Sequence, residues 1–137
     1  MAYIGKTYVE VRSENIEAFV KSLKIPDNVA DMIIKSKSKQ KLEKNGDDYV
    51  LTSHLNEMPM VVSFKSGVEF DEKVGPKGQE RQAKTTFTVD GNKVTQVQKF
   101  SDGNIITLVR EYGSDKLEMT ITTSSCSDTA KRYYVAE

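Results

Sequence analysis

The sequence predicts an all-β protein, an antiparallel barrel of ten short strands with a pair of short helices over one open end. Two helical segments occur together near the start, between about residues 15 and 35. From about residue 37 onward, runs rich in β-branched and aromatic residues alternate with turn residues at a spacing of roughly 8–12 positions. So many strands after a helix pair share one core best when the sheet closes on itself as a barrel or flattened clam.

Size and charge narrow the classes of function. The 137 residues have the length of one domain, so residues 1–137 are expected to form a single unit. Twenty Lys and Arg balance twenty Asp and Glu, which argues against a nucleic acid as partner. One cysteine and a start without an apolar leader predict a cytoplasmic protein, and a monomer is the simplest expectation.

The first elements expected are a strand and two short helices. Residues 7–11 have strand composition, and candidate N-cap residues at 13–15 precede a helix. Its apolar residues recur at helical spacing: Ile16, Phe19, Val20 and Leu23. Pro26 ends this helix, Asp27 or Asn28 can cap a second, and a second apolar face follows, ending near Lys35. Phe19 is the helix residue expected to contact both the barrel and a ligand.

Turns delimit the remaining strands. Residues that tolerate a positive φ or form local hydrogen bonds gather at 45–47, 65–67, 75–78, 90–92, 102–104 and 113–115. Turns are also expected near Met58 and in the last hairpin at 123–128, and these eight turns together with the first strand imply ten strands.

Strand parity predicts which side chains face the interior. Lysines at 35, 37, 39 and 41 alternate along the second strand and belong on the solvent face, which turns Ser36, Ser38, Gln40 and Leu42 inward. Three later strands give the inward sets Ile106, Leu108, Arg110 and Tyr112; Leu117, Met119 and Ile121; Ala130, Arg132 and Tyr134. An interior that mixes polar and aliphatic residues suits a cavity for an amphiphile.

Arg110 and Arg132 are the most informative of these inward residues. Tyr134 shares the face of Arg132 because two residues separate them on one strand. A guanidinium buried without a counter-charge costs roughly several kcal/mol, so two of them beside a phenol hydroxyl favour binding of an anion. The sequence therefore predicts a ligand that carries a carboxylate.

Several segments in this order resemble the intracellular fatty-acid-binding proteins, which are intracellular lipid-binding proteins of the calycin superfamily. The segments are Gly5-Lys6-Thr7-Tyr8 with Ser13-Glu14-Asn15-Ile16, Phe64 to Glu72, Thr107 to Glu111, and Ala130-Lys131-Arg132-Tyr133-Tyr134. The resemblance covers essentially the whole chain. Tyr8 stands where many members have Trp, the 75–78 turn is longer than in vertebrate muscle forms, and residues 123–128 lengthen the last hairpin. The longer turn, the longer hairpin and the Arg132-Tyr133-Tyr134 ending are more similar to invertebrate members.

The resemblance implies a ten-stranded flattened barrel (β-clam) with a helix-turn-helix lid and a cavity for one long-chain fatty acid. It also implies that Arg110, Arg132 and Tyr134 hold the ligand carboxylate. An arginine at position 110 favours an acid over an alcohol, so a retinoic-acid carrier of the same fold remains an alternative. Lower-ranked candidates for the cavity and its portal are Phe19, Ser38, Gln40, Met58, Leu108, Met119 and Ile121.

The lysines near the lid have two interpretations. Lys21, Lys24, Lys35 and Lys37 can form an ordinary solvated face, or they can bring the lid to an anionic membrane during ligand transfer. A third class of function, a membrane-surface transfer or stacking module, would use these lysines more than the cavity.

Catalysis and metal binding have no support in the sequence. His54, the only histidine, has no nucleophile beside it, and Cys126 has no second cysteine or histidine to activate it. We therefore expect a carrier that is not an enzyme and that uses no cofactor and no metal.

Overall fold

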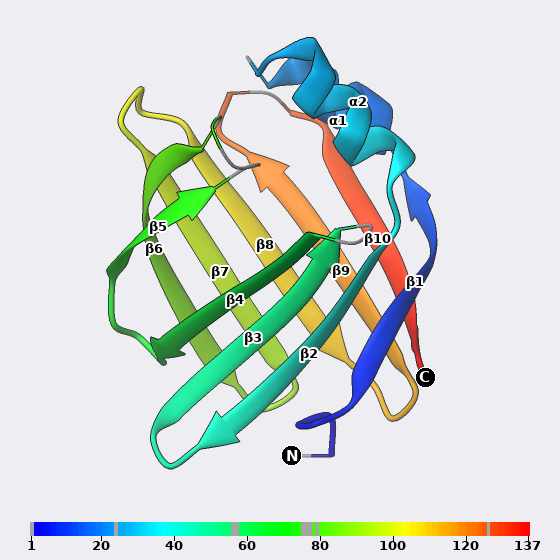
Figure 1. The fold of residues 1–137 in the computed structure, drawn as a ribbon, viewed down its shortest axis with the longest axis vertical. Helices are drawn as coiled ribbons and strands as arrows, with labels where there is room; N and C mark the ends of the chain where they lie inside the picture. Colours follow the sequence, from blue (N-terminus) through cyan, green and yellow to red (C-terminus); the bar gives the residue numbers. More distant parts are fainter. Residues whose placement is uncertain (1, 24, 56–57, 75–77, 79, 126) are drawn as a thin grey trace.

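The computed structural model describes residues 2–23, 25–55, 58–74, 78, 80–125 and 127–137, with the side chain of Met58 outside that description. Ten antiparallel strands form one curled sheet, a nearly closed barrel, and two helices cover one end (Figure 1). The predicted fold class is confirmed. The strands are β1 Thr7–Glu14, β2 Ser38–Asn45, β3 Asp48–Leu55, β4 Met58–Lys65, β5 Phe70–Val74, β6 Arg81–Asp90, β7 Lys93–Phe100, β8 Ile105–Tyr112, β9 Lys116–Thr123 and β10 Thr129–Ala136.

The strand order around the barrel is almost the order of the sequence. It runs β4-β3-β2-β1-β10-β9-β8-β7-β6-β5, so the first strand lies between the second and the last. The two edge strands, β4 and β5, are not paired with each other. The barrel therefore closes through the β1–β10 pair and has one open seam between β4 and β5.

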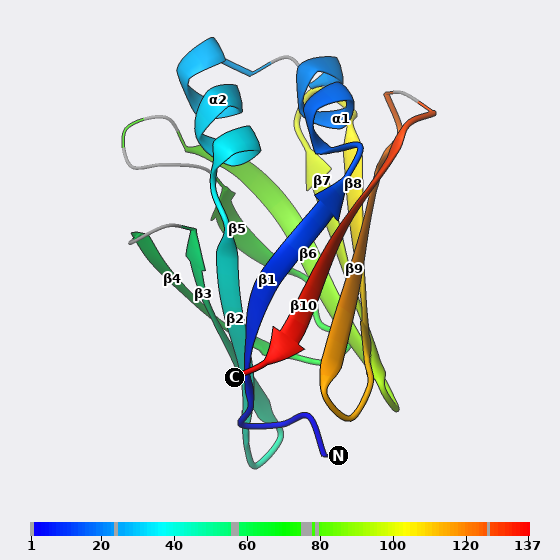
Figure 2. The ribbon, with the colours of Figure 1, turned by 90° about the vertical axis from the view of Figure 1, so that its right-hand side faces the viewer.

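The lid consists of α1, Ile16–Ser22, and α2, Asp27–Lys35 (Figure 2). Ile16, Phe19 and Val20 of α1 are buried, as is Val29 of α2. Asn15, the N-cap of α1, has a left-handed backbone (φ 57°), and its amide donates to the carbonyl of Thr129 on β10 at 3.1 Å. This bond ties the start of the lid to the barrel wall.

Some predicted boundaries were wrong. β1 continues to Glu14, so Ser13 and Glu14 belong to the strand rather than to a helix cap. Pro26 itself is the N-cap of α2, with Asp27 as the first helical residue. β2 begins only at Ser38, which leaves Lys35 at the end of α2 and Lys37 in the connection. Proline supplies no N–H, and its fixed φ suits a helix start, so the chain enters α2 directly.

The predicted inward faces are confirmed. Every residue of the three later inward sets is buried except Leu108, which is half-buried. Stacked rings form the apolar part of the core, with Phe64 against Phe87 at 4.1 Å and Tyr3 against Tyr112 at 4.1 Å. The core also holds buried polar side chains, among them Glu10, Gln40, Arg110 and Arg132. No helix among the described residues is long and apolar enough to cross a bilayer.

Candidate ligand site inside the barrel

Arg110, Arg132 and Tyr134 all point into the barrel. Arg110 comes from β8, and Arg132 and Tyr134 come from β10; their exposed fractions are 6%, 5% and 1%. The two strands are separated by β9, whose Met119 pairs with Arg110 on one side and with Arg132 on the other. The structure thus brings together the three residues predicted to bind a carboxylate.

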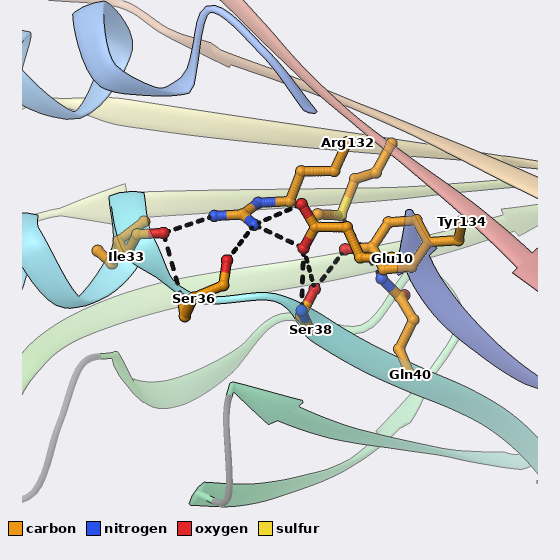
Figure 3. Close-up of polar contacts among 8 residues, drawn as sticks. Glu10, Ile33, Ser36, Ser38, Gln40, Arg132 and Tyr134 are labelled. Carbon is orange, nitrogen blue, oxygen red and sulfur yellow. Dashed lines mark hydrogen bonds and ion pairs between the residues drawn. The ribbon is translucent and has the colours of Figure 1, made fainter. Parts of the chain in front are cut away.

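Arg132 already has a counter-charge. Its Nη1 donates to both carboxylate oxygens of Glu10, at 2.7 Å to Oε1 and 2.9 Å to Oε2 (Figure 3). The two side chains are only 6% and 3% exposed, so this is a buried ion pair. The expectation that both arginines lack a counter-charge is therefore wrong for Arg132. Glu10 shares the inward face of β1 with Tyr8, and β1 lies directly beside β10.

Arg132 also holds the end of the lid. Its Nη2 donates to the carbonyl of Ile33 at 3.1 Å, and Nη1 makes a longer contact of 3.5 Å with the carbonyl of Ser36. The last carbonyls of a helix have no partner within the helix, so a cation placed there satisfies them and complements the helix dipole. One guanidinium thus connects β10, β1 and the C-terminal end of α2.

Tyr134 belongs to the same network. Its hydroxyl shares a 2.7 Å hydrogen bond with Oγ of Ser38. Ser38 in turn donates to Glu10 Oε1 from its backbone N–H at 2.9 Å and from its hydroxyl at 3.2 Å. Burial raises the pKa of Tyr134, and the hydrogen bond to Ser38 and the charges of Arg132 and Arg110 partly oppose this effect. The phenol therefore stays protonated at neutral pH and can donate a hydrogen bond.

Arg110 is different, because its partners among the described residues are uncharged. Nε donates to Gln40 Oε1 at 2.7 Å, and Nη1 donates to Gln96 Oε1 at 3.0 Å. Among the residues that the structure describes, no carboxylate lies within ion-pair distance of it. Burial lowers the pKa of Arg110, while the nearby Tyr112, Tyr134 and Glu72 raise it. Because the usual pKa of arginine is above about 12, the side chain remains a buried cation.

A second polar group continues from Arg110 across the interior. Glu72 of β5 accepts hydrogen bonds at Oε1 from Thr85 at 2.7 Å, Gln98 at 3.1 Å and Gln96 at 3.4 Å. Gln96 thus bridges the guanidinium of Arg110 and the carboxylate of Glu72. This relay supplies only indirect compensation, since the amide side chain separates the two charges.

Two tyrosine hydroxyls near this region have no partner among the described residues. The hydroxyls of Tyr8 and Tyr112 are buried without a hydrogen bond, and the two rings meet edge to face at 5.4 Å. Burial raises the pKa of Tyr112 to about 12, despite the opposing charge of Arg110. Most buried polar groups in proteins are hydrogen-bonded, so these two hydroxyls are exceptions in the interior.

Several functional candidates were missed in the sequence. Glu10, Glu72, Thr85, Gln96 and Gln98 contribute to the two polar groups, and none of them was predicted. The alternation of residues along β7 could have identified Gln96 and Gln98, because they lie on the same inward face as Val94 and Phe100. β5 is only five residues long, so its pattern is too short to assign Glu72 to a face.

The lower-ranked candidates have mixed outcomes. Phe19 is one of the buried residues of α1. Leu108, Met119 and Ile121 face the interior of the barrel. Gln40 contacts Arg110 as described, and its amide also approaches the sulfur of Met119 at 3.9 Å. The side chain of Met58 and all of Lys24 and Cys126 lie outside the described residues. His54 lies on β3, opposite Lys39 and Pro59, and within the described part of the chain no cluster of potential metal ligands occurs.

The lid lysines that the structure describes are exposed. Lys21 forms an ion pair with Glu17 at 2.8 Å, with both side chains 65% exposed. Lys35 and Lys37 are exposed and have no ion pair among the described residues. Of the lid lysines within the described part of the chain, Lys35 and Lys37 therefore offer positive charge that no ion pair compensates.

Comparisons with known proteins identify the family. No protein-family model matches the chain. Fatty acid-binding protein 2 of Manduca sexta is 43% identical over 136 residues, which are 99% of this chain and 100% of that protein. The crystal structure of a fatty-acid-binding protein isolated from Manduca sexta has a TM-score of 0.89 and 42% identity, covering 98% of this chain and 99% of that one.

A fatty-acid-binding protein from the brain of Drosophila melanogaster is also similar. It has a TM-score of 0.86 and 33% identity and covers 98% of this chain and 99% of that one. The likeness extends over both the barrel and the lid, and the identity to an insect relative of the same length is high. The chain therefore belongs to the family of fatty-acid-binding proteins.

Proposed function

We propose that this protein is a cytosolic carrier that binds one long-chain fatty acid inside the barrel. We place its carboxylate next to Arg110, in the polar cluster that also contains Arg132 and Tyr134. Relatives of this chain are named for binding fatty acids, and this family membership confirms the prediction that the chain is not an enzyme. The identity of the ligand and the residues that hold it are the proposal.

The observation that carries the proposal is the buried cation of Arg110, which has no carboxylate within ion-pair distance among the residues that the structure describes. Its Nε and Nη1 bind neutral amides, at 2.7 and 3.0 Å, and its exposed fraction is 6%. A buried charge without a counter-charge is unfavourable. An anion that binds Arg110 forms charge-assisted hydrogen bonds with it, and these replace the hydrogen bonds that the anion made with water. A ligand carboxylate has both the charge and the geometry to do this.

The remainder of the interior suits an acyl chain. Leu108, Met119 and Ile121 face inward beside the stacked rings of Phe64 and Phe87. Burial of a methylene group contributes about 0.8 kcal/mol before ordering costs. The chain would therefore supply most of the affinity, and the charged cluster would select the head group. A retinoic acid presents the same carboxylate, so it belongs in the binding test as a competitor.

Delivery is proposed to include brief contact of the lid with anionic membranes. Lys35 and Lys37 support this idea, since they are exposed at the end of α2 without ion pairs among the described residues. Lys21 contributes less because Glu17 compensates it. Each lysine near an anionic surface contributes about 1 kcal/mol.

The test is binding of oleate and of oleyl alcohol to delipidated protein. We expect native mass spectrometry to show one oleate per chain. Arg110→Gln should weaken oleate about tenfold or more and leave oleyl alcohol nearly unchanged, because only the acid uses the charge. Arg12→Gln is the matched control, since Arg12 lies on the outer surface with its side chain 59% exposed. Equal losses for both lipids, or no uptake of either lipid or of retinoic acid, would contradict the proposal.

A further inference from the structure

We propose that Glu10 is a specificity-determining residue of the ligand site. Its own carboxylate pairs with Arg132. Of the two buried arginines, Arg110 is then the one available to the negative group of a ligand. The protein should then discriminate less sharply between acids and uncharged lipids of equal chain length than its two buried arginines suggest. This inference rests on the proposed function, because it concerns the head group of that ligand.

The first argument is charge. Both oxygens of Glu10 contact one nitrogen of Arg132, at 2.7 and 2.9 Å, and neither side chain is more than 6% exposed. The pair is neutral as a unit. A ligand carboxylate placed on Arg132 would lie beside a second carboxylate in a region from which water is largely excluded, and like charges repel strongly there.

The second argument is that Glu10 is firmly held. Oε1 accepts three hydrogen bonds, from Arg132 and from the backbone and hydroxyl of Ser38, and Oε2 accepts one. Ser38 is tied in turn to the hydroxyl of Tyr134. To displace Glu10, a ligand would have to break this set and leave a buried carboxylate without donors, which costs more than one new ion pair returns.

The third argument is the environment of Arg132 on its other side. There its guanidinium contacts the carbonyls of Ile33 and Ser36 at the end of α2. Arg132 therefore serves the lid and Glu10, whereas the hydrogen bonds of Arg110 to described residues go to the amides of Gln40 and Gln96, with the ring of Phe87 at 5.9 Å. A ligand carboxylate could replace those neutral acceptors without any loss of charge pairing.

The experiment compares the affinities for oleate and oleyl alcohol in variants of the full chain. Glu10→Gln keeps the size of the side chain and frees the charge of Arg132. We expect the preference for oleate over oleyl alcohol to rise about tenfold or more. Glu14→Gln is the matched control, because Glu14 lies on the same strand with an exposed side chain. The preference of this variant for oleate over oleyl alcohol should equal that of the unmodified protein. Adding Arg132→Gln to Glu10→Gln should abolish the gain, since the freed charge is its source.

A measurement on the unmodified chain guards against a variant that fails to fold. The Nε–Hε signals of the buried arginines can be followed by nitrogen-15 NMR while oleate is added, with Arg110→Gln giving the assignment. The signal of Arg110 should shift, and that of Arg132 should stay. A preference that does not rise in folded Glu10→Gln, or an Arg132 signal that shifts in place of that of Arg110, would overturn the inference. Failure of the proposed function differs, because neither lipid would then bind the unmodified protein.

Discussion

Tyr112 shows how one buried side chain couples this protein to pH. Its ring stacks on Tyr3 at 4.1 Å and meets the edge of Tyr8 at 5.4 Å, and its hydroxyl has no partner among the described residues. Burial raises its pKa from 10.0 to about 12. The native state therefore keeps this proton at a pH where the unfolded chain has lost it.

We predict a loss of stability between pH 10 and pH 12 that depends on Tyr112. Since the native pKa is above the unfolded one, the contribution is complete below pH 10 and is lost as the pH rises toward 12, by roughly 2–3 kcal/mol in all. Urea unfolding at several pH values should show a smaller decrease in Tyr112→Phe. Some decrease will remain, because burial also raises the pKa of Tyr3, Tyr8 and Tyr134. Tyr133→Phe, a change on the outer face, is the control, and an unchanged slope in Tyr112→Phe would refute the prediction.

At the scale of single residues, sequence reasoning found the cations and missed their partners. Alternation along β8 and β10 was sufficient to turn Arg110, Arg132 and Tyr134 inward. Glu10 alternates with Tyr8 in the same way, but its significance depends on a neighbour 122 positions away. No local pattern states that β1 pairs with β10, so the counter-charge of Arg132 could not be derived from the sequence.

The lid is the element in which structure and proposed delivery meet. Its two helices were predicted from caps and apolar spacing, and both formed within the expected range of residues. The bonds that attach the lid to the barrel were not predicted. They are the hydrogen bond from Arg132 to the carbonyl of Ile33 in α2 and the hydrogen bond from Asn15 to the carbonyl of Thr129 in β10. Such contacts depend on how the helices sit on the barrel, and helical periodicity carries no information about that.

Replacement of the free lid lysines should slow ligand transfer. We predict that Lys35→Gln/Lys37→Gln reduces the rate of transfer of a fluorescent fatty acid to phosphatidylserine vesicles about fivefold or more, because each charge contributes about 1 kcal/mol near the surface. The control is Lys93→Gln/Lys116→Gln, which removes the same charge from the first residues of β7 and β9. Both strands begin at the end of the barrel opposite the helices (Figure 1). Equal rates for the two double variants would show that the position of the charge has no role.

At the scale of the whole molecule, the sheet is continuous except at one seam. Each strand from β3 through β2, β1 and β10 to β6 has two neighbours, whereas β4 and β5 each have one. The turns of the sequence predicted the number of strands well, because turn residues act locally. They could not reveal where the closed sheet stays open, since that depends on pairing between distant strands.

The seam predicts a pattern of hydrogen exchange. Edge strands leave half of their amides without sheet partners, so peptides covering β4 and β5 should exchange roughly tenfold faster than peptides covering β9 and β10. Mass spectrometry of the ligand-free protein measures this directly. Similar protection of the four strands would mean that β4 and β5 are covered in solution.

The pairing of β1 with β10 also sets an order for folding during synthesis. Except for β5, which pairs with β6, each strand from β2 to β9 can pair with the strand made just before it. β1 meets β2 over only three residue pairs and gains its longer pairing when β10 is made. Until then Glu10 has no Arg132, and the end of α2 has no cation to hold it. β10 is made after the other strands of the barrel, and it pairs with β1, brings Arg132 to Glu10 and attaches the lid through the carbonyl of Ile33. These three events should therefore occur together and late in folding.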